Sequence, residues 1–206
     1  IRRPPRSTQS RSSAASDVYK RQALIGPGNG IGNETKARAL MALAFIDHVV
    51  LDADALTVFA DNPEELFIDC YPHTILTPHE GEFKKIFGNK INDIEDRVLK
   101  TSEAAKISNT VVVLKGADTI IASPKGDVVI NKSSAAYLAT AGSGDVLAGI
   151  IVSLVGKNKM AAFDAACAGV WLHSQIGEIL GAGMIAEDII DLIPITIKKL
   201  IKFELS

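Results

Sequence analysis

The chain has 206 residues, which is enough for one domain with a sizeable hydrophobic core and too few for two ordinary domains. It is 47% hydrophobic and 22% charged, as is typical of a globular protein and not of a disordered one. No stretch approaches the roughly 18 uninterrupted apolar residues of a membrane helix, so we expect no membrane partner.

The formal net charge of −2 is unevenly distributed. Residues 1–22 carry six basic residues and one acidic residue, a net of +5, so the remainder carries −7 and is a poor candidate for binding nucleic acid. This Arg/Ser-rich composition is shared by organellar transit peptides, basic nucleic-acid arms and translated adapter or vector sequence. Because Pro4 and Pro5 disfavour an amphipathic helix, we interpret residues 1–22 as a non-native, disordered segment.

From residue 23 onward, strand-like and helix-like segments alternate. ALIG leads through the glycine-rich GPGNGIGN to a helical stretch, for which Asn33 is a candidate N-cap. The β-branched HVVL, the strand-and-turn segment TILTPHEGEF, a polar-faced helix and the buried strand of TVVVLKG follow. DTIIAS and DVVINK, which are separated by turn residues, predict a hairpin. The C-terminal third, from DVLAGIIVSLVG onward, is helical in composition.

This alternation predicts an α/β fold, with a mostly parallel sheet covered by helices on both faces and the hairpin added antiparallel. In such sheets ligands bind beyond the carboxyl ends of the strands. The loops of interest are therefore GPGNG, DADAL, TPHEGE, LKGADT and AGSGD. Cys70 and Cys167 are far apart and lack metal-ligand spacing, so we expect a reduced, cytoplasmic protein.

The segment AGSGDVLAGI places two glycines and one acid at the start of an apolar helix. We expect that helix to begin at or near Asp145, so its first N–H groups and positive dipole end would face the loop. Gly142 and Gly144 let the backbone turn and let an anion approach, which makes a phosphate cradle. The alternative is a loop in which Asp145 is an ordinary N-cap worth about 1 kcal/mol.

The other loops are individually less specific. Lys115 ends a strand, where it would meet a phosphate or ribose or else be a solvated turn lysine. His79 and its acidic neighbours fit either a site or the first turn of a helix. Asp52 and Asp54 either help to hold Mg²⁺ or cap a short helix. GPGNGIG fails the dinucleotide-binding fingerprint. We interpret the remaining histidines, His48, His73 and His173, as structural. We interpret Trp171 as a core residue.

The order of these motifs is more specific than any one of them. GPGNG, DADAL, LTPHEGEF, VVLKGADT and LATAGSGDVLAGII, followed by an Ala-rich helix with WLHS and by MIAEDIID, resemble the ADP/ATP-dependent NAD(P)H-hydrate dehydratases of the ribokinase-like superfamily. The resemblance covers residues 23–206. It implies a three-layer α/β/α sandwich that lacks its initial elements, and an enzyme that repairs hydrated nicotinamide cofactors.

The implied reaction is phosphorylation of the hydroxyl of the S-epimer of hydrated NADH or NADPH (NADHX, NADPHX), then loss of phosphate to regenerate the cofactor. ADP, favoured here over ATP, would leave as AMP, and Mg²⁺ would bridge its phosphates without protein ligands. Asp145 would be the general base. The implied nucleotide-binding residues are Lys115, Gly116, Ala117, Asp118, Thr119, Gly142, Ser143 and Gly144. The implied substrate-binding residues are Gly28, Asn29, Gly30, His79 and Asp145.

The resemblance also implies partners and raises alternatives. Relatives form tetramers and pair with an NAD(P)HX epimerase. Two departures stand out: Glu80 occupies a position where relatives more often have proline, and the segment expected before Ala23 is absent. The competing hypotheses are a vitamin-precursor kinase of the same superfamily and an inactive, truncated nucleotide-binding fragment.

Overall fold

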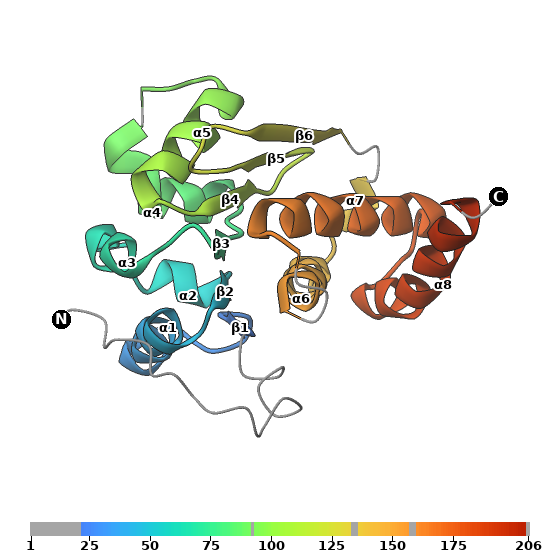
Figure 1. Ribbon diagram of the computed structural model, residues 1–206, viewed down its shortest axis with the longest axis horizontal. Coiled ribbons are helices and arrows are strands. Elements are labelled where there is room, and N and C mark those ends of the chain that lie inside the picture. The colour runs from blue at the N-terminus through green and yellow to red at the C-terminus, as the bar shows by residue number, and fades with distance from the viewer. Residues whose placement is uncertain (1–21, 92, 133–135, 157–159, 205–206) are drawn as a thin grey trace.

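The computed structural model describes residues 22–91, 93–132, 136–156 and 160–204. Their strands form one sheet in sequence order (Figure 1). The first four strands run parallel and the last two antiparallel. The strands are β1 (Gln22–Ile25), β2 (His48–Leu51), β3 (Thr74–Leu76), β4 (Val111–Leu114), β5 (Asp118–Ala122) and β6 (Val128–Lys132).

Helices cover both faces of this sheet, so the described chain is a three-layer α/β/α sandwich. One face carries α1 (Asn33–Phe45), α2 (Asp54–Thr57), α3 (Pro63–Asp69), α4 (Glu80–Ile91) and α5 (Arg97–Ser108). The other carries α6 (Ser143–Gly156) and α7 (Ala162–Leu180), with α8 (Ala186–Glu204) packed against both at the end of the molecule farthest from α1 (Figure 1). A short 3₁₀ helix, η2, spans Ala136–Leu138.

The strands divide their side chains between the two helical layers, because successive residues of a strand point to opposite faces. In β2, Val49 and Leu51 join the core under α1–α5, whereas Val50 joins the core under α6 and α7. In β4, Val112 and Val113 divide in the same way. A strand buried on both faces must be apolar throughout, which explains the unbroken VVVL run. The predicted fold class is confirmed.

The predicted hairpin is also confirmed, with β5 paired antiparallel to β6. Ser123 closes its turn: its N–H donates to the Asp127 carbonyl and its hydroxyl to the Asp127 carboxylate. Gly126 has a φ of +98°, a conformation that glycine adopts without steric cost.

Helix α6 begins at Ser143, in agreement with the predicted start at or near Asp145. Two details of the sequence analysis were wrong. The N-cap of α1 is Gly32, and no side chain caps that helix. Trp171 is 40% exposed, because the face of α7 toward the sheet is lined by smaller residues such as Ala166. The interpretation of residues 1–22 lies outside the described residues, apart from Gln22 in β1.

The carboxyl ends of the parallel strands are joined by backbone hydrogen bonds that continue past the strands. The N–H groups of Asp52, Thr77 and Lys115 donate to the carbonyls of Ile25, Leu51 and Pro78, respectively. Consequently, the loops after β1, β2, β3 and β4 lie side by side at one edge of the sheet.

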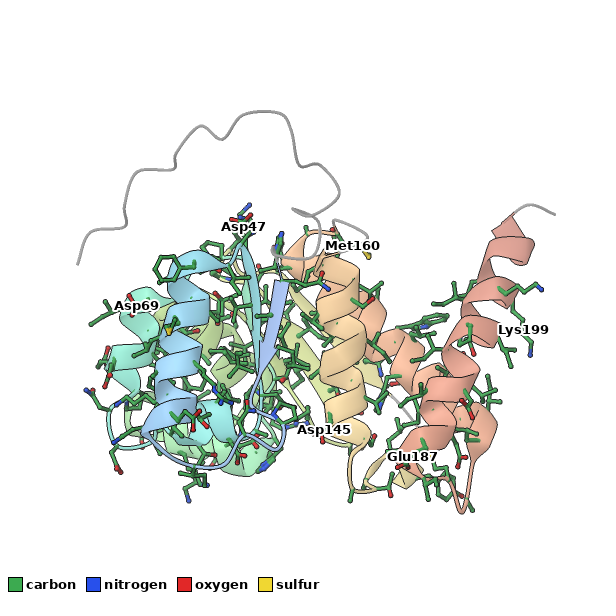
Figure 2. The ribbon with its side chains drawn as sticks, turned by 90° about the horizontal axis from the view of Figure 1, so that it is seen from below. Asp47, Asp69, Asp145, Met160, Glu187 and Lys199 are labelled. Carbon is green, nitrogen blue, oxygen red and sulfur yellow. The ribbon has the colours of Figure 1, made fainter. Side chains whose placement is uncertain are left out.

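Helix α6 delivers its N-terminus to this same edge. The side chain of Gln22, at the start of β1, lies against Gly156, the last residue of α6, so the helix runs antiparallel to the strand. Figure 2 shows Asp145 at the opposite end of the sheet layer from Asp47, which precedes β2. In the part of the chain that the structure describes, no helix is long and apolar enough to cross a membrane.

Candidate active site

A cavity of about 700 Å³ opens where the β3, β4 and α6 loops meet the inner side of α7. Its walls come from four separate stretches of the chain, which only the tertiary fold brings together. They contain seven of the residues for which the sequence predicts a binding role. These are His79, Lys115, Gly116, Ala117, Thr119, Ser143 and Gly144.

Lys115 is held in place by a buried carboxylate. Its Nζ lies 2.7 Å from Oδ1 of Asp52, which is only 1% exposed at the end of β2. A Cβ atom placed on Gly144 would lie 3.4 Å from the same Nζ. The ammonium group of Lys115 therefore lies between Asp52 and the N-terminus of α6, on the cavity wall.

The first turn of α6 has the geometry of an anion site. Ser143 and Gly144 line the cavity at a helix N-terminus, where backbone N–H groups lack intrahelical partners. The helix dipole adds partial positive charge and Lys115 adds a full one nearby. This arrangement suits a phosphate group. Gly142 and Asp118, two other predicted nucleotide-binding residues, lie outside the cavity lining.

His79 is fixed by a reciprocal cap at the start of α4. Its Nδ1 accepts hydrogen bonds from the backbone N–H groups of Gly81 and Glu82. The backbone N–H of His79 in turn donates to Oε2 of Glu82. The imidazole of His79 is thus held at the cavity edge with its Nδ1 already engaged, and its Nε2 lies 3.3 Å from Oε1 of Glu82.

Glu80, at the start of α4, turns toward α5. Its carboxylate accepts hydrogen bonds from Nε of Arg97 and Nζ of Lys100 at 2.7 and 3.0 Å. Partial burial alone raises the pKa of Glu80, but the bonds from Lys100 and Arg97 outweigh it and lower the pKa. Arg97 also donates from Nη1 to the carbonyl of Asp118. The ion pair of Glu80 with Arg97 thereby connects the loop after β3 to the loop after β4.

The glycine-rich loop after β1 is exposed and held by local contacts. Oδ1 of Asn29 accepts from the N–H of Gly26, and the hydroxyl of Thr35 donates to the carbonyls of Asn29 and Gly30. Oδ2 of Asp54 accepts from the N–H of Gly30 at 2.8 Å. The predicted substrate residues Gly28, Asn29 and Gly30 are all exposed and lie outside the cavity lining.

Asp145 is exposed in the first turn of α6, next to the cavity-lining Gly144 but not itself in the lining. Because α6 packs against β1 and β2, the first turn of the helix lies at the end of the sheet from which the glycine-rich loop departs. Asp145 therefore lies between the glycine-rich loop after β1 and the loops after β3 and β4 that line the cavity. Its exposed carboxylate can contact a ligand that enters from solvent.

The sequence analysis missed His173, which it interpreted as structural. This side chain is 6% exposed, lines the cavity, and lies 2.9 Å from the Ser143 hydroxyl through Nε2. The available signal was an ionisable residue on the helix face that also carries Ala166, Gly169 and Val170, a face which periodicity assigns to the core.

The two aspartates considered for Mg²⁺ have other roles in the structure. Asp52 pairs with Lys115, and Asp54 binds the Gly30 N–H without capping α2. Within residues 22–91, 93–132, 136–156 and 160–204, no three His, Cys, Asp or Glu side chains gather into a metal cage. These donors do not form a dedicated Mg²⁺ site, so an ion bound here would depend on the oxygens of a phosphate ligand.

The sequence of this chain matches a known family. The model of the NAD(P)H-hydrate dehydratase family matches residues 5–195. This chain belongs to the NAD(P)H-hydrate dehydratase family. One relative, the ADP-dependent (S)-NAD(P)H-hydrate dehydratase of Neisseria meningitidis serogroup B, is 38% identical over 190 residues, which is 85% of this chain and 64% of the relative.

Solved structures agree with this assignment. The ADP/ATP-dependent NAD(P)H-hydrate dehydratase of Bacillus subtilis, co-crystallised with ATP and Mg²⁺ and soaked with CoA, superposes with a TM-score of 0.74 and 31% identity, covering 87% of this chain and 66% of that one. A ribokinase-like superfamily protein of Enterococcus faecalis gives a TM-score of 0.75 and 25% identity, covering 86% and 63%. The ribokinase-like fold predicted from the sequence is therefore confirmed.

The chain spans less than two thirds of the length of these family members. Several other relatives are bifunctional NAD(P)H-hydrate repair enzymes, of which this chain covers 32%.

Proposed function

We propose that this chain catalyses the ADP-dependent dehydration of the S-epimer of hydrated NADH or NADPH, releasing AMP and phosphate and regenerating the reduced cofactor. The observation that carries the proposal is the grouping of Lys115, Ser143 and Gly144 around one cavity at the N-terminus of α6. Such a grouping is suited to phosphoryl transfer, which depends on positioning and on stabilising the charge of the transferring group.

The nucleotide would occupy the cavity with its phosphates at the first turn of α6. Lys115 and the adjoining Gly116, Ala117 and Thr119 would contact the nucleotide from the β4–β5 side. Nζ of Lys115 is held by Asp52 beside Gly144, where it would offset the charge of the phosphoryl group in flight. The co-crystallised ATP and Mg²⁺ of the Bacillus structure support a nucleotide co-substrate. The ADP-dependent Neisseria relative favours ADP.

The hydrated nicotinamide would approach from the other side of α6, between the glycine-rich loop and His79. Asp145 would accept the proton of the substrate hydroxyl. The hydroxyl oxygen would then bond to the β-phosphorus of ADP, and the bond between that phosphorus and the oxygen of AMP would break. Loss of inorganic phosphate from the phosphorylated carbon, with loss of a proton from the adjacent ring carbon to solvent, then restores the ring double bond. Mg²⁺, carried by the nucleotide phosphates, supplies additional charge neutralisation.

The wider proposals follow the family. Substrates are small molecules, and the reaction partner is an NAD(P)HX epimerase, as the bifunctional relatives suggest. A homotetramer is proposed from the resemblance alone. A cytoplasmic location is proposed because Cys70 and Cys167 are free thiols, which a reducing compartment maintains.

Product analysis tests the proposal against its nearest alternative. The 206-residue chain is incubated with NADHX, ADP and Mg²⁺, and phosphorus NMR follows the nucleotide and phosphate signals. We expect AMP and free phosphate in equal amounts, together with NADH. A vitamin-precursor kinase would instead convert its alcohol substrate to a stable phosphate ester and leave NADHX unchanged. Absence of AMP and phosphate above the enzyme-free control contradicts the proposal.

A further inference from the structure

Ser143 and His173 form a buried polar pair in the cavity wall. Ser143 is the first residue of α6 and His173 lies on the inner face of α7, thirty positions later in the chain. Their exposed fractions are 2% and 6%, and both line the cavity. The sequence analysis implies a nucleotide-binding role for Ser143 but gives His173 none.

The hydrogen-bond geometry fixes which atom carries the proton. Nε2 of His173 lies 2.9 Å from the Ser143 hydroxyl oxygen and 3.0 Å from the Ser143 carbonyl oxygen. A carbonyl oxygen only accepts, so Nε2 must be the protonated nitrogen that donates to it. The hydroxyl oxygen then accepts from the same N–H group, and the hydroxyl proton remains available to another acceptor.

We propose that His173 is a positioning residue that turns the Ser143 hydroxyl into a hydrogen-bond donor for a phosphate oxygen of the bound nucleotide. The inference rests on the proposed function, which places the nucleotide phosphates at this turn of α6. Ser143 would thus contribute its hydroxyl, because its backbone N–H already donates to the carbonyl of Thr140. A hydroxyl oriented before binding loses less rotational freedom when the ligand arrives.

The electrostatics separate this role from that of Lys115. Burial lowers the pKa of His173 to about 4, with the nearby charge of Lys115 acting in the same direction and the hydrogen bond to Ser143 acting against it. His173 is therefore neutral at physiological pH. Lys115 supplies the positive charge of the site, whereas His173 supplies orientation.

Binding of ADP and of adenosine to the 206-residue chain separates a phosphate contact from general damage to the cavity. We expect Ser143→Ala to weaken ADP binding about tenfold or more, because hydrogen bonds to charged groups are among the stronger ones. Adenosine binding, which involves no phosphate, should change less than about twofold. Isothermal titration calorimetry gives both dissociation constants.

His173 variants test whether the imidazole acts through the hydroxyl. His173→Leu should weaken ADP binding by about threefold to tenfold, and His173→Gln, which keeps an N–H donor, by less. The double variant Ser143→Ala/His173→Leu should be no weaker than Ser143→Ala alone, because the two side chains act as one unit. Ser108→Ala, which removes a buried serine hydroxyl from α5, is the matched control and should leave ADP binding unchanged.

The outcomes distinguish this inference from the proposed function. If Ser143→Ala binds ADP like the wild type, weakens adenosine equally, or adds fully to His173→Leu, the inference is wrong. If the wild type fails to bind ADP, the inference and the proposed function both fall. If Ser143→Ala selectively weakens ADP binding but the wild type yields no NADH from NADHX, only the proposed dehydratase is overturned.

Discussion

The two groups of loops on either side of the α6 N-terminus are built in different ways. On the cavity side, Asp52, Lys115, Ser143 and His173 come from four distant segments and meet through largely buried polar contacts. On the other side, the loop at residues 26–32, which is exposed from residue 28 onward, is held by a few hydrogen bonds, most of them local. For the proposed function, this difference would give a preformed side for the nucleotide and an adaptable side for the proposed dinucleotide substrate.

Asp145, at the boundary between the two sides, should show the largest effect. Asp145→Asn removes the proposed general base and should lower turnover of NADHX by about 10²- to 10⁴-fold. Because the side chain is exposed and outside the cavity lining, ADP binding and thermal stability should be unchanged. Turnover by absorbance and binding by calorimetry check the two halves of this prediction. Retention of more than half of the wild-type rate would remove Asp145 from the mechanism.

Lys115 tests whether the nucleotide side is preformed by buried charge. Lys115→Met should lower the free energy of unfolding by about 3 kcal/mol, because it leaves the carboxylate of Asp52 buried without its partner. The double variant Lys115→Met/Asp52→Asn should regain most of this loss. Lys36→Met, which breaks the more exposed pair with Glu65, is the control and should cost less than about 1 kcal/mol. Urea unfolding measures all three, and an equal loss in control and test would contradict the account.

The same side should respond to pH through His173. The folded-state pKa of His173 is lowered to about 4 from 6.5, so the unfolded chain binds more protons between these values. The stability conferred by neutral His173 is full above pH 6.5 and is lost as the pH falls toward 4. Relative to His173→Gln, the wild type should lose about 2 kcal/mol of unfolding free energy from about pH 7.5 to 5. Parallel curves for the two proteins would show that His173 does not titrate as described.

A substitution of Asp54 tests the exposed glycine-rich loop, as the substitutions above test the cavity side. Asp54→Ala removes the acceptor for the Gly30 N–H, a contact worth about 1 kcal/mol. We expect the KM for NADHX to rise about fivefold while ADP binding is unchanged, because the cavity lining does not include this loop. Steady-state kinetics with each substrate varied in turn separate the two. An equal loss of ADP affinity would mean that the two sides are not independent.

The smallest effect is expected at Glu80, which connects the loops after β3 and β4. Its partners Arg97 and Lys100 are partly exposed, so Glu80→Gln should cost about 0.5 kcal/mol of stability at low salt and less at high salt. Urea unfolding at two ionic strengths measures this. A salt-independent loss above about 2 kcal/mol would show that the pair is more than a surface ion pair.

Sequence reasoning succeeded where the signal was local or periodic. The alternation of β-branched strand segments with helical segments predicted the sheet, the turn residues around Gly126 predicted the hairpin, and the glycines before α6 predicted a turn into that helix. It failed for contacts between distant segments. Asp52 and Lys115 are 63 positions apart, and His173 lies on a helix face that looks like core. Nothing in a periodic pattern reveals a partner contributed by another element.

The most direct measurement is the recovery of dihydronicotinamide absorbance at 340 nm when the 206-residue chain meets NADHX with Mg²⁺ and either ADP or ATP. The account predicts recovery that requires a nucleotide and is faster with ADP. Recovery without nucleotide, or none with either nucleotide while ADP still binds, would contradict the claim that this cavity carries out nucleotide-dependent dehydration.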